Sequence, residues 1–373
     1  MTMIQDLETR PTLDLEDTRD TLAWVENAYV IPPIPGNRSR ENPSGVLDAQ
    51  RRFVEQSQSW VSPDRPVNAP PEVASEQMPM LKGRYLFGGI LYGHFGHFIV
   101  ESLARLWAQD AIEGPIDGMI FTPKVPGFPE KSVQLLQRRA EALGLRVPLI
   151  VANEPTRVEH LCVPRQGFGM GELAGGSPAF RDFMNAHAGA HIAPEGGEKL
   201  YISRSDLPPF RGSLLGEKRL EAWLEAQGFE IFHPQRHSTE DQIARYKAAR
   251  LIVSTDCSPL HLVGFVGNAH QRVVIVTRRS MEISDYLAVQ LRAFKGMEVS
   301  IATCLLNDWM PQPGRRPSRT SFGEVDFPSL QAHLRAAGFI RDEAPWAALD
   351  DDERRAEIDR LSASHETTFL PFR

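Results

Sequence analysis

Short apolar segments alternate with amphipathic segments through the second half of the chain. The apolar runs at residues 199–203, 229–232, 251–253 and 272–277 have the length of buried strands, and the residues between them have apolar positions at helical spacing. Strands that alternate with helices favour right-handed crossovers and a parallel, Rossmann-like sheet. The pattern therefore predicts an α/β domain over residues 196–310.

The first half shows the same alternation less clearly. We expect strands at residues 84–90, 118–122, 147–151 and 158–163, and helices at residues 95–109, 130–143 and 178–191. These elements predict a second Rossmann-like domain over residues 81–195. The expected fold class is α/β, with two parallel sheets that face a cleft in which a ligand binds.

The two ends of the chain break this pattern. Residues 1–80 are rich in proline and acidic residues, so we expect an extended lead-in rather than a domain. Residues 311–373 predict a proline-rich linker followed by a helical tail. Residues 350–352 form an Asp-x-Asp sequence, which we interpret as a solvated acidic helix start rather than a metal site.

Charge and composition narrow the class of protein. The net charge of −7 disfavours nucleic acid as a partner, because the chain has no overall basic field. The three cysteines are widely spaced, which suits a reducing compartment better than a disulfide framework or a zinc site. Acidic residues interrupt any signal-peptide pattern, and the longest apolar run, residues 85–100, is too short and polar to span a membrane. We expect a cytoplasmic protein.

Two predicted strands are followed by groups that suit a phosphate. Ser203 and Arg204 follow the strand that begins at residue 199, and arginine can grip a phosphate at two points. Ser258 and the proline after it predict a helix start, where backbone N–H groups and the positive end of the helix dipole favour anions. We therefore expect a ligand with a diphosphate, bound by Arg204 and by the helix start at Ser258, Leu260 and His261.

The loop between the two segments has a second candidate arginine. Residues 205–210 contain adjacent prolines and cannot be helical, and Arg211 follows them. A surface loop with solvated arginines is the alternative, but ligands of open α/β sheets bind near the carboxyl ends of strands. Cys257 precedes the second helix and is either a nucleophile or, as we expect, a buried thiol.

The helix expected from residue 95 has a candidate acid–base pair. His97, Glu101 and Arg105 follow one another at intervals of four, so one helix face would hold all three. Glu101 would orient His97 as a general base, and Arg105 would keep Glu101 ionised. An ordinary helix-start histidine beside a Glu–Arg pair is the alternative. His94, His97 and Glu101 are also possible metal ligands, although their spacing lacks the His-Glu-x-x-His signature.

These motifs, in this order, resemble those of glycosyltransferase family 61. Residues 97–105 are similar to the family's His-x-x-x-Glu-x-x-x-Arg segment, residues 201–204 to its Tyr-Ile-Ser-Arg sequence, and residues 258–261 to its Gly-Ser-Ala-Leu-His-Asn sequence. Arg211 lies where an arginine usually follows. The resemblance runs over residues 90–280 and rests on the ordered set rather than on any single motif.

The resemblance implies a GT-B-like architecture and an inverting transfer that needs no Asp-x-Asp metal motif. We expect a hexosyl- or pentosyltransferase that takes a sugar from a nucleotide-diphosphate donor, UDP-linked, to a saccharide acceptor in the synthesis of capsule-like surface polysaccharide or glycoconjugate. No metal or separate cofactor is expected. The alternatives are a catalytically inactive saccharide-binding or scaffold protein of the same fold, and a metal-dependent hydrolase built on the histidine segment.

Overall fold

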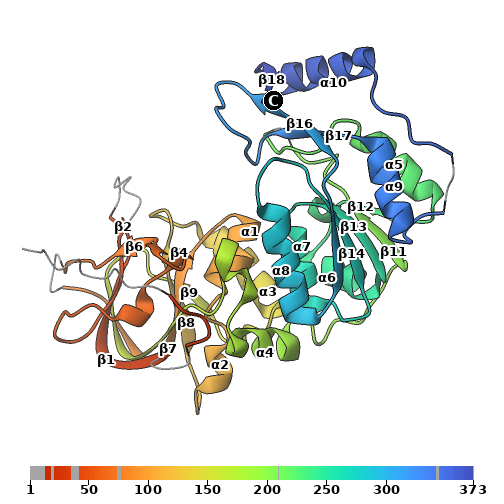
Figure 1. Cartoon of the computed structure of the whole chain (residues 1–373). Helices are drawn as coiled ribbons and strands as arrows, with labels where there is room; N and C mark the ends of the chain where they lie inside the picture. The colour runs from red at the N-terminus through yellow and green to blue at the C-terminus, as the bar shows by residue number, and fades with distance from the viewer. Residues whose placement is uncertain are drawn as a thin grey trace, which may run out of the picture. The chain divides into compact units, whose positions relative to one another are not determined.

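The computed structural model describes residues 13–17, 21–34, 42–73, 77–208, 210–341 and 344–372. The chain divides into two compact units, Met1–Ala188 and Gly189–Arg373, each with its own main sheet (Figure 1). The boundary lies between residues 188 and 189 rather than between 195 and 196, because the segment before β11 packs with unit 2: Lys247 of α6 (Thr239–Ala248) donates to the Gly189 carbonyl at 2.9 Å.

Unit 1 contains a six-stranded sheet in the order β3-β1-β10-β7-β8-β9. Its strands are β1 (Leu22–Ile31), β3 (Gly45–Leu47), β7 (Met80–Leu91), β8 (Gly118–Pro123), β9 (Leu149–Val151) and β10 (Thr156–Pro164). β10, β7, β8 and β9 run parallel to one another, whereas β1 is antiparallel to both β10 and β3. The sheet is therefore mixed, and the expectation of a wholly parallel sheet is wrong for this unit.

The expected lead-in over residues 1–80 is also wrong for part of its length. β1 pairs with β10 along eight residue pairs, and its side chains Val25 and Val30 fill the unit 1 core beside Phe87 and Leu161. The short pairs β2 (Asn42–Pro43) with β6 (Asn68–Ala69) and β4 (Trp60–Ser62) with β5 (Arg65–Pro66) follow. The start and several other parts of this segment lie outside the described residues. The buried side chains of β1 make this segment part of the unit 1 domain, although its high proline content suggested an extended lead-in.

Helices and turns cover the unit 1 sheet. They are η1 (Glu55–Ser57), α1 (Phe95–His97), η2 (Phe98–Ser102), α2 (Ala108–Ala111), α3 (Glu130–Ala142), η3 (Gly171–Gly175) and α4 (Pro178–His187). The single helix expected over residues 95–109 is thus interrupted, since η2 is a π-helical turn in which the Leu103 N–H donates to the Phe98 carbonyl at 3.2 Å. That change of hydrogen-bond register alters which side chains share a face.

Unit 2 contains the parallel sheet that the alternating pattern predicts. Its order is β12-β11-β13-β14-β15, formed by β11 (Lys199–Ile202), β12 (Glu230–Phe232), β13 (Leu251–Thr255), β14 (Arg272–Val276) and β15 (Glu298–Ala302). Figure 1 shows α6, α7 (Pro259–Val266) and α8 (Ile283–Lys295) on one face of this sheet, and α5 (Glu217–Ala226) and α9 (Phe327–Ala336) on the other. In chain order the strands are arranged 2-1-3-4-5, a doubly wound topology.

Residues 311–373, which we expected to be a linker and a helical tail, belong to unit 2. β16 (Leu305–Pro311), β17 (Phe322–Val325) and β18 (Phe369–Pro371) form a three-stranded antiparallel sheet, so residues 311–317 connect two of its strands. Side chains from α9, α10 (Asp351–Ser364) and β18 share the core of the parallel sheet. The Asp350 side chain caps α10, which confirms that residues 350–352 are an acidic helix start.

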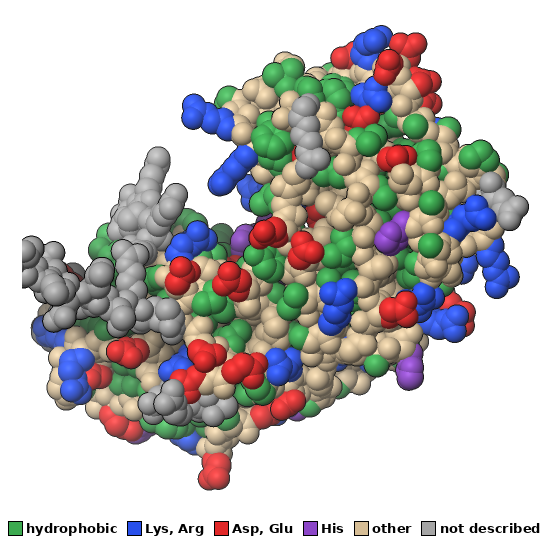
Figure 2. All heavy atoms as spheres, in the orientation of Figure 1, with side chains coloured by type: hydrophobic (Ala, Val, Ile, Leu, Met, Phe, Trp, Pro, Cys, Tyr) green, Lys and Arg blue, Asp and Glu red, His purple; other side chains and the backbone are tan. Residues whose placement is uncertain are grey.

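Two further observations concern the surface. Among the residues described, no helix is long and apolar enough to cross a membrane. On the face seen in Figure 2, acidic and basic side chains are interspersed and no continuous basic patch is visible, in keeping with the net charge of −7.

Candidate functional site

The order of the unit 2 sheet creates a topological switch point between β11 and β13. The chain continues from β11 to β12 on one side of the sheet, and from β13 to β14 on the other. Ligands of open α/β sheets bind outside the carboxyl ends of the strands at such a point. Ile202 lies opposite Ser254 in the register of these strands, so the segments after β11 and β13 leave the sheet as neighbours.

Arg204 occupies this edge and is partly buried. Its Nε and Nη2 atoms both donate to the Gly212 carbonyl, at 2.9 and 2.8 Å, and its backbone N–H donates to Glu217 at 2.9 Å. Burial, followed by the positive charge of Arg278, lowers the pKa of Arg204 to about 10. No carboxylate of the described residues lies within ion-pair distance of its guanidinium. The charges of Glu217 and Asp256 act on Arg204 from farther away and favour its charged form.

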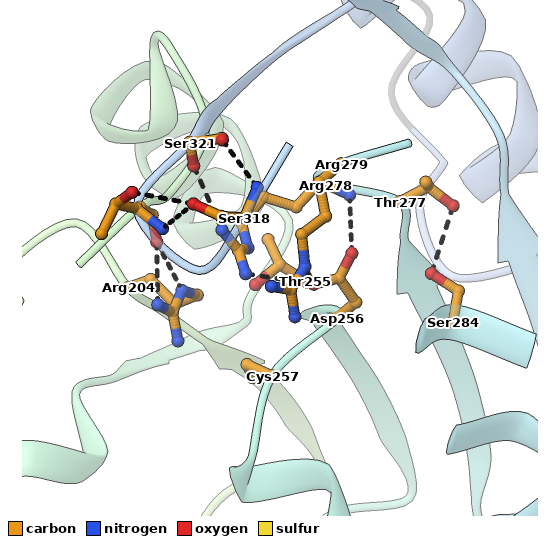
Figure 3. A network of polar contacts seen from close by, with 12 residues as sticks. Arg204, Thr255, Asp256, Cys257, Thr277, Arg278, Arg279, Ser284, Ser318 and Ser321 are labelled. Carbon is orange, nitrogen blue, oxygen red and sulfur yellow. Dashed lines mark hydrogen bonds and ion pairs between the residues drawn. The ribbon is translucent and has the colours of Figure 1, made fainter. Parts of the chain in front are cut away.

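Two more arginines reach the same edge from β14. Asp256, which is fully buried after β13, has its Oδ1 atom 3.2 Å from Arg278 Nη2 and 3.2 Å from Arg279 Nε (Figure 3). Arg278 is only 2% exposed and also donates to the Ser321 carbonyl at 3.2 Å. Burial, and then the charge of Arg278, lowers the pKa of Arg279. We call Arg204, Arg278 and Arg279, together with Asp256, the arginine cluster.

Among the described residues, Asp256 is the carboxylate that forms ion pairs with the arginines of the cluster. Arg278 and Arg279 share Asp256, while Arg204 has only a carbonyl. The Nε atom of Arg278 and the hydroxyl of Thr255 are buried without a hydrogen-bond partner, although buried polar groups nearly always have one. A bound anion would supply both the missing charge and acceptor atoms.

Sequence reasoning missed Arg278 and Arg279. They follow β14 by two and three residues, just as Arg204 follows β11 by two. The signal that identified Arg204 was therefore present at a second strand. Asp256, on the neighbouring strand end, pairs with both and so keeps two adjacent arginines at this edge.

The helix start at Ser258 differs from expectation. Ser258 has helical backbone angles and its side chain makes no capping hydrogen bond. The N–H groups of Leu260 and His261 donate to the carbonyls of Cys257 and Ser258 at 3.1 and 3.0 Å, so these two groups are not free for a phosphate. The His261 ring contacts Gln290 of α8 through Nδ1 at 2.6 Å. Cys257 is buried, as expected, and burial raises the pKa of its thiol.

The remaining predicted residues of unit 2 surround Arg204. The Ser203 hydroxyl is buried and donates to Glu221. Arg211 and Arg204 line one pocket of about 240 Å³. The structure thus brings Arg204 and Arg211 together.

The predicted acid–base pair of unit 1 is formed. His97 Nδ1 contacts Glu101 Oε2, with the imidazole 46% exposed and the carboxylate 9% exposed. The Tyr92 ring stacks on His97 with 5.3 Å between ring centroids. Burial, and then the charge of Glu101, raises the pKa of the Tyr92 hydroxyl. Glu101 lies in the π-helical turn η2, a type of turn that is frequent at functional sites.

Arg105 does not stabilise Glu101, which corrects the sequence prediction. The π-helical turn and the bends after it rotate Arg105 away, and it is fully buried. Its Nε and Nη2 atoms donate to the carbonyls of Pro164 and Gln58 at 2.8 and 2.7 Å. The cation whose charge interacts with Glu101 is Lys124, which follows β8. Burial lowers the pKa of Lys124, and Glu101 opposes that shift.

The histidine segment does not form a metal centre in this structure. The ring of His94 lies edge-on to that of His97, with centroids 5.4 Å apart. In the part of the chain that the structure describes, no three His, Cys, Asp or Glu side chains are grouped to hold a metal ion. The arrangement therefore gives no support to the metal-dependent hydrolase.

Unit 2 is a doubly wound α/β domain with an arginine cluster at the switch point of its sheet. Residues 95–276 match the model of the family described as Glycosyltransferase 61, which supports both the resemblance to that family and a glycosyltransferase. The matched stretch includes His97, Arg204 and Ser258, and it ends before Arg278 and Arg279. No curated protein matches the chain.

Proposed function

We propose that the protein is a glycosyltransferase that moves a sugar from a nucleotide-diphosphate donor to a saccharide acceptor. The observation that carries the proposal is the arginine cluster, in which Arg278 and Arg279 share the carboxylate of Asp256 while the nearby Arg204 donates to a backbone carbonyl. A diphosphate supplies the negative charge that the cluster lacks. The family match supports the same class of reaction.

The arginine cluster would act on the leaving group. When the bond between the anomeric carbon and the diphosphate oxygen breaks, its electron pair stays with that oxygen and negative charge grows there. Arg204 would donate hydrogen bonds to this oxygen or its neighbours, and Arg278 and Arg279 would add their positive field. Guanidinium groups can thus take the place of a divalent cation on the diphosphate, so we propose a metal-independent reaction.

His97 would remove the proton of the acceptor hydroxyl. The acceptor oxygen forms a bond to the anomeric carbon, and its proton passes to the imidazole. Because Nδ1 of His97 faces Glu101, the carboxylate fixes the ring tautomer and stabilises the imidazolium that results. Lys124 and Tyr92 both interact with Glu101, the carboxylate on which this base depends.

The finer features rest on the motif resemblance. We propose a GT-B-like, inverting enzyme with a UDP-linked hexose or pentose as donor. Its acceptor would be a saccharide of a capsule-like surface polysaccharide or another glycoconjugate, and the reaction would take place in the cytoplasm. His261 and the Ser258 helix start would lie near the nucleotide, although two of the expected N–H donors there are already engaged.

A donor panel tests the proposal. The purified chain is incubated with UDP-, GDP- and deoxythymidine-diphosphate sugars and mixed saccharide acceptors, and release of the nucleoside diphosphate is measured. A thermal-shift assay with the free nucleotides runs in parallel, because a ligand that binds the folded state raises Tm. Acceptor-dependent release supports the proposal. Saccharide binding without release from any donor would indicate the inactive binding protein instead.

A further inference from the structure

The C-terminal helix forms one wall of the pocket that contains Arg204 and Arg211. This pocket, of about 240 Å³, is lined on one side by the loop after β11 and on the other by Arg360, Ser364 and His365. We call it the tail pocket. α10 lies beyond the stretch that matches the family model, so the motifs gave no indication of its role.

The two walls are held together by direct contacts. The Gly216 N–H donates to Glu357 of α10 at 2.7 Å. The ring of Phe210, in the loop after β11, meets the ring of His365 edge-on with centroids 5.5 Å apart, and Phe322 and Phe369 pack on the same imidazole. His365 in turn contacts the Leu361 carbonyl at 2.9 Å. The end of α10 is therefore fixed against the loop.

The charges of the tail pocket are unbalanced in favour of cations. Its basic residues are Arg204, Arg211, Lys218 and Arg360. Lys218 already pairs with Asp206 at 2.9 Å and Glu221 at 3.2 Å, so the excess of positive charge comes from the arginines. Of its two carboxylates, Glu217 accepts from the Tyr201 hydroxyl at 2.8 Å and from a backbone N–H at 2.9 Å.

The second carboxylate, Glu357, is likewise engaged. It accepts from the Gly216 N–H and from Arg360 at 3.3 Å. Burial raises the pKa of both carboxyl groups.

Arg211 shows the same need for an anion. It is partly buried, and neither a hydrogen bond nor an ion pair joins it to the residues that the structure describes. In addition, Nε2 of His365 is buried without a hydrogen-bond partner in a side chain that is only 6% exposed. A pocket with an unpartnered arginine, engaged carboxylates and two fixed walls is built to receive a negatively charged group.

We propose that α10 completes the diphosphate site, with Arg360 and Arg211 binding phosphate oxygens from opposite walls of the tail pocket. The inference rests on the proposed function and deepens it, since it assigns a donor-binding role to the C-terminal helix. Arg204 lines the tail pocket and also belongs to the arginine cluster. A diphosphate bound in the tail pocket would therefore contact the arginine cluster through Arg204. No covalent step is involved.

The test compares Arg360→Gln with Arg355→Gln. Both arginines lie on α10, are 66% and 69% exposed, and pair with an acidic residue three positions earlier, but only Arg360 lines the pocket. Glutamine keeps the helix propensity and removes the charge. Calorimetry measures binding of UDP, inorganic pyrophosphate and uridine. We expect Arg360→Gln to weaken the binding of UDP and pyrophosphate about tenfold to a hundredfold, the scale of one charge-assisted hydrogen bond. Uridine binding, and all binding by Arg355→Gln, should match the parent.

The outcomes separate this inference from the proposed function. Equal UDP affinity in Arg360→Gln and the parent overturns the role of α10 while leaving the transferase proposal intact. Loss of UDP binding with unchanged pyrophosphate binding also overturns it, because Arg360 would then contact the nucleoside. If the parent binds neither UDP nor pyrophosphate, both the tail-pocket role and the proposed donor class fall.

Discussion

The buried arginines of the two units differ in what already satisfies them. Arg105 in unit 1 is fully buried, and its donors reach the carbonyls of Pro164, Gln58 and Gln56. Arg204 in unit 2 reaches one carbonyl, that of Gly212, and lies at the wall of a pocket. Burial lowers the pKa of both, to about 9 and about 10 respectively.

The difference shows how to separate a structural arginine from a binding one. Carbonyl oxygens that surround a guanidinium satisfy its hydrogen bonds, and a ligand then has little to add. An arginine with few acceptors, no counter-ion and another arginine nearby gains much from an anion. By this criterion Arg105 joins segments of unit 1, whereas Arg204 of unit 2 is suited to bind an anion.

The largest expected effect concerns His97. Replacement by alanine should lower the rate of sugar transfer by about 10²- to 10⁴-fold, the usual contribution of a general base. UDP affinity should change little, because the base acts on the acceptor. Steady-state turnover and calorimetry measure the two quantities, with His160→Ala as a control at another unit 1 histidine that pairs with a glutamate. Near-normal turnover in His97→Ala would show that another group is the general base.

The Arg105→Met variant tests the structural half of the comparison. The new side chain leaves the carbonyls of Pro164 and Gln58 buried without their donors, so we expect unit 1 to lose about 3 kcal/mol of stability. UDP affinity should stay the same wherever the protein is folded. Urea unfolding compares the loss of stability in this variant with that in Arg204→Met, which removes the hydrogen bonds to the Gly212 carbonyl alone. Equal losses of stability in the two variants would show that Arg204 is as much a structural residue as Arg105.

The Arg204→Lys variant tests the binding half. Lysine keeps the charge but not the planar pair of donors, so UDP affinity should fall nearly as far as in Arg204→Ala, by about 2 kcal/mol. Calorimetry on both variants provides the measurement. Parent-like binding by both would make Arg204 a structural residue like Arg105, and would place the diphosphate elsewhere.

The smallest effect is expected from a chelator. If guanidinium groups alone neutralise the leaving diphosphate, EDTA should leave turnover unchanged. Activity that disappears with EDTA and returns with Mn²⁺ or Mg²⁺ would show that the arginine cluster is insufficient. The same assay is also run on Arg204→Ala. If an added divalent cation restores turnover in this variant, the positive charge of Arg204 is what the reaction needs.

The sequence by itself determined the local features of unit 2. Apolar runs at strand length, separated by helical segments, specified the parallel sheet, since burial of both faces of each strand demands such runs. Arg204 was identified because its place after β11 follows from chain order alone. The contact of His97 with Glu101 was also predictable, because residues four apart in a helical turn are neighbours.

Only the tertiary structure decided which distant groups meet. Asp256, Arg278 and Arg279 converge because β13 pairs with β14. α10 and Arg211 line one pocket because Leu361 of α10 joins the core of the parallel sheet. In unit 1, β1 enters the sheet beside β10, and the π-helical turn directs Arg105 away from Glu101. Strand pairing and core packing act between residues far apart in the chain, whereas a sequence pattern reports only the preferences of neighbours.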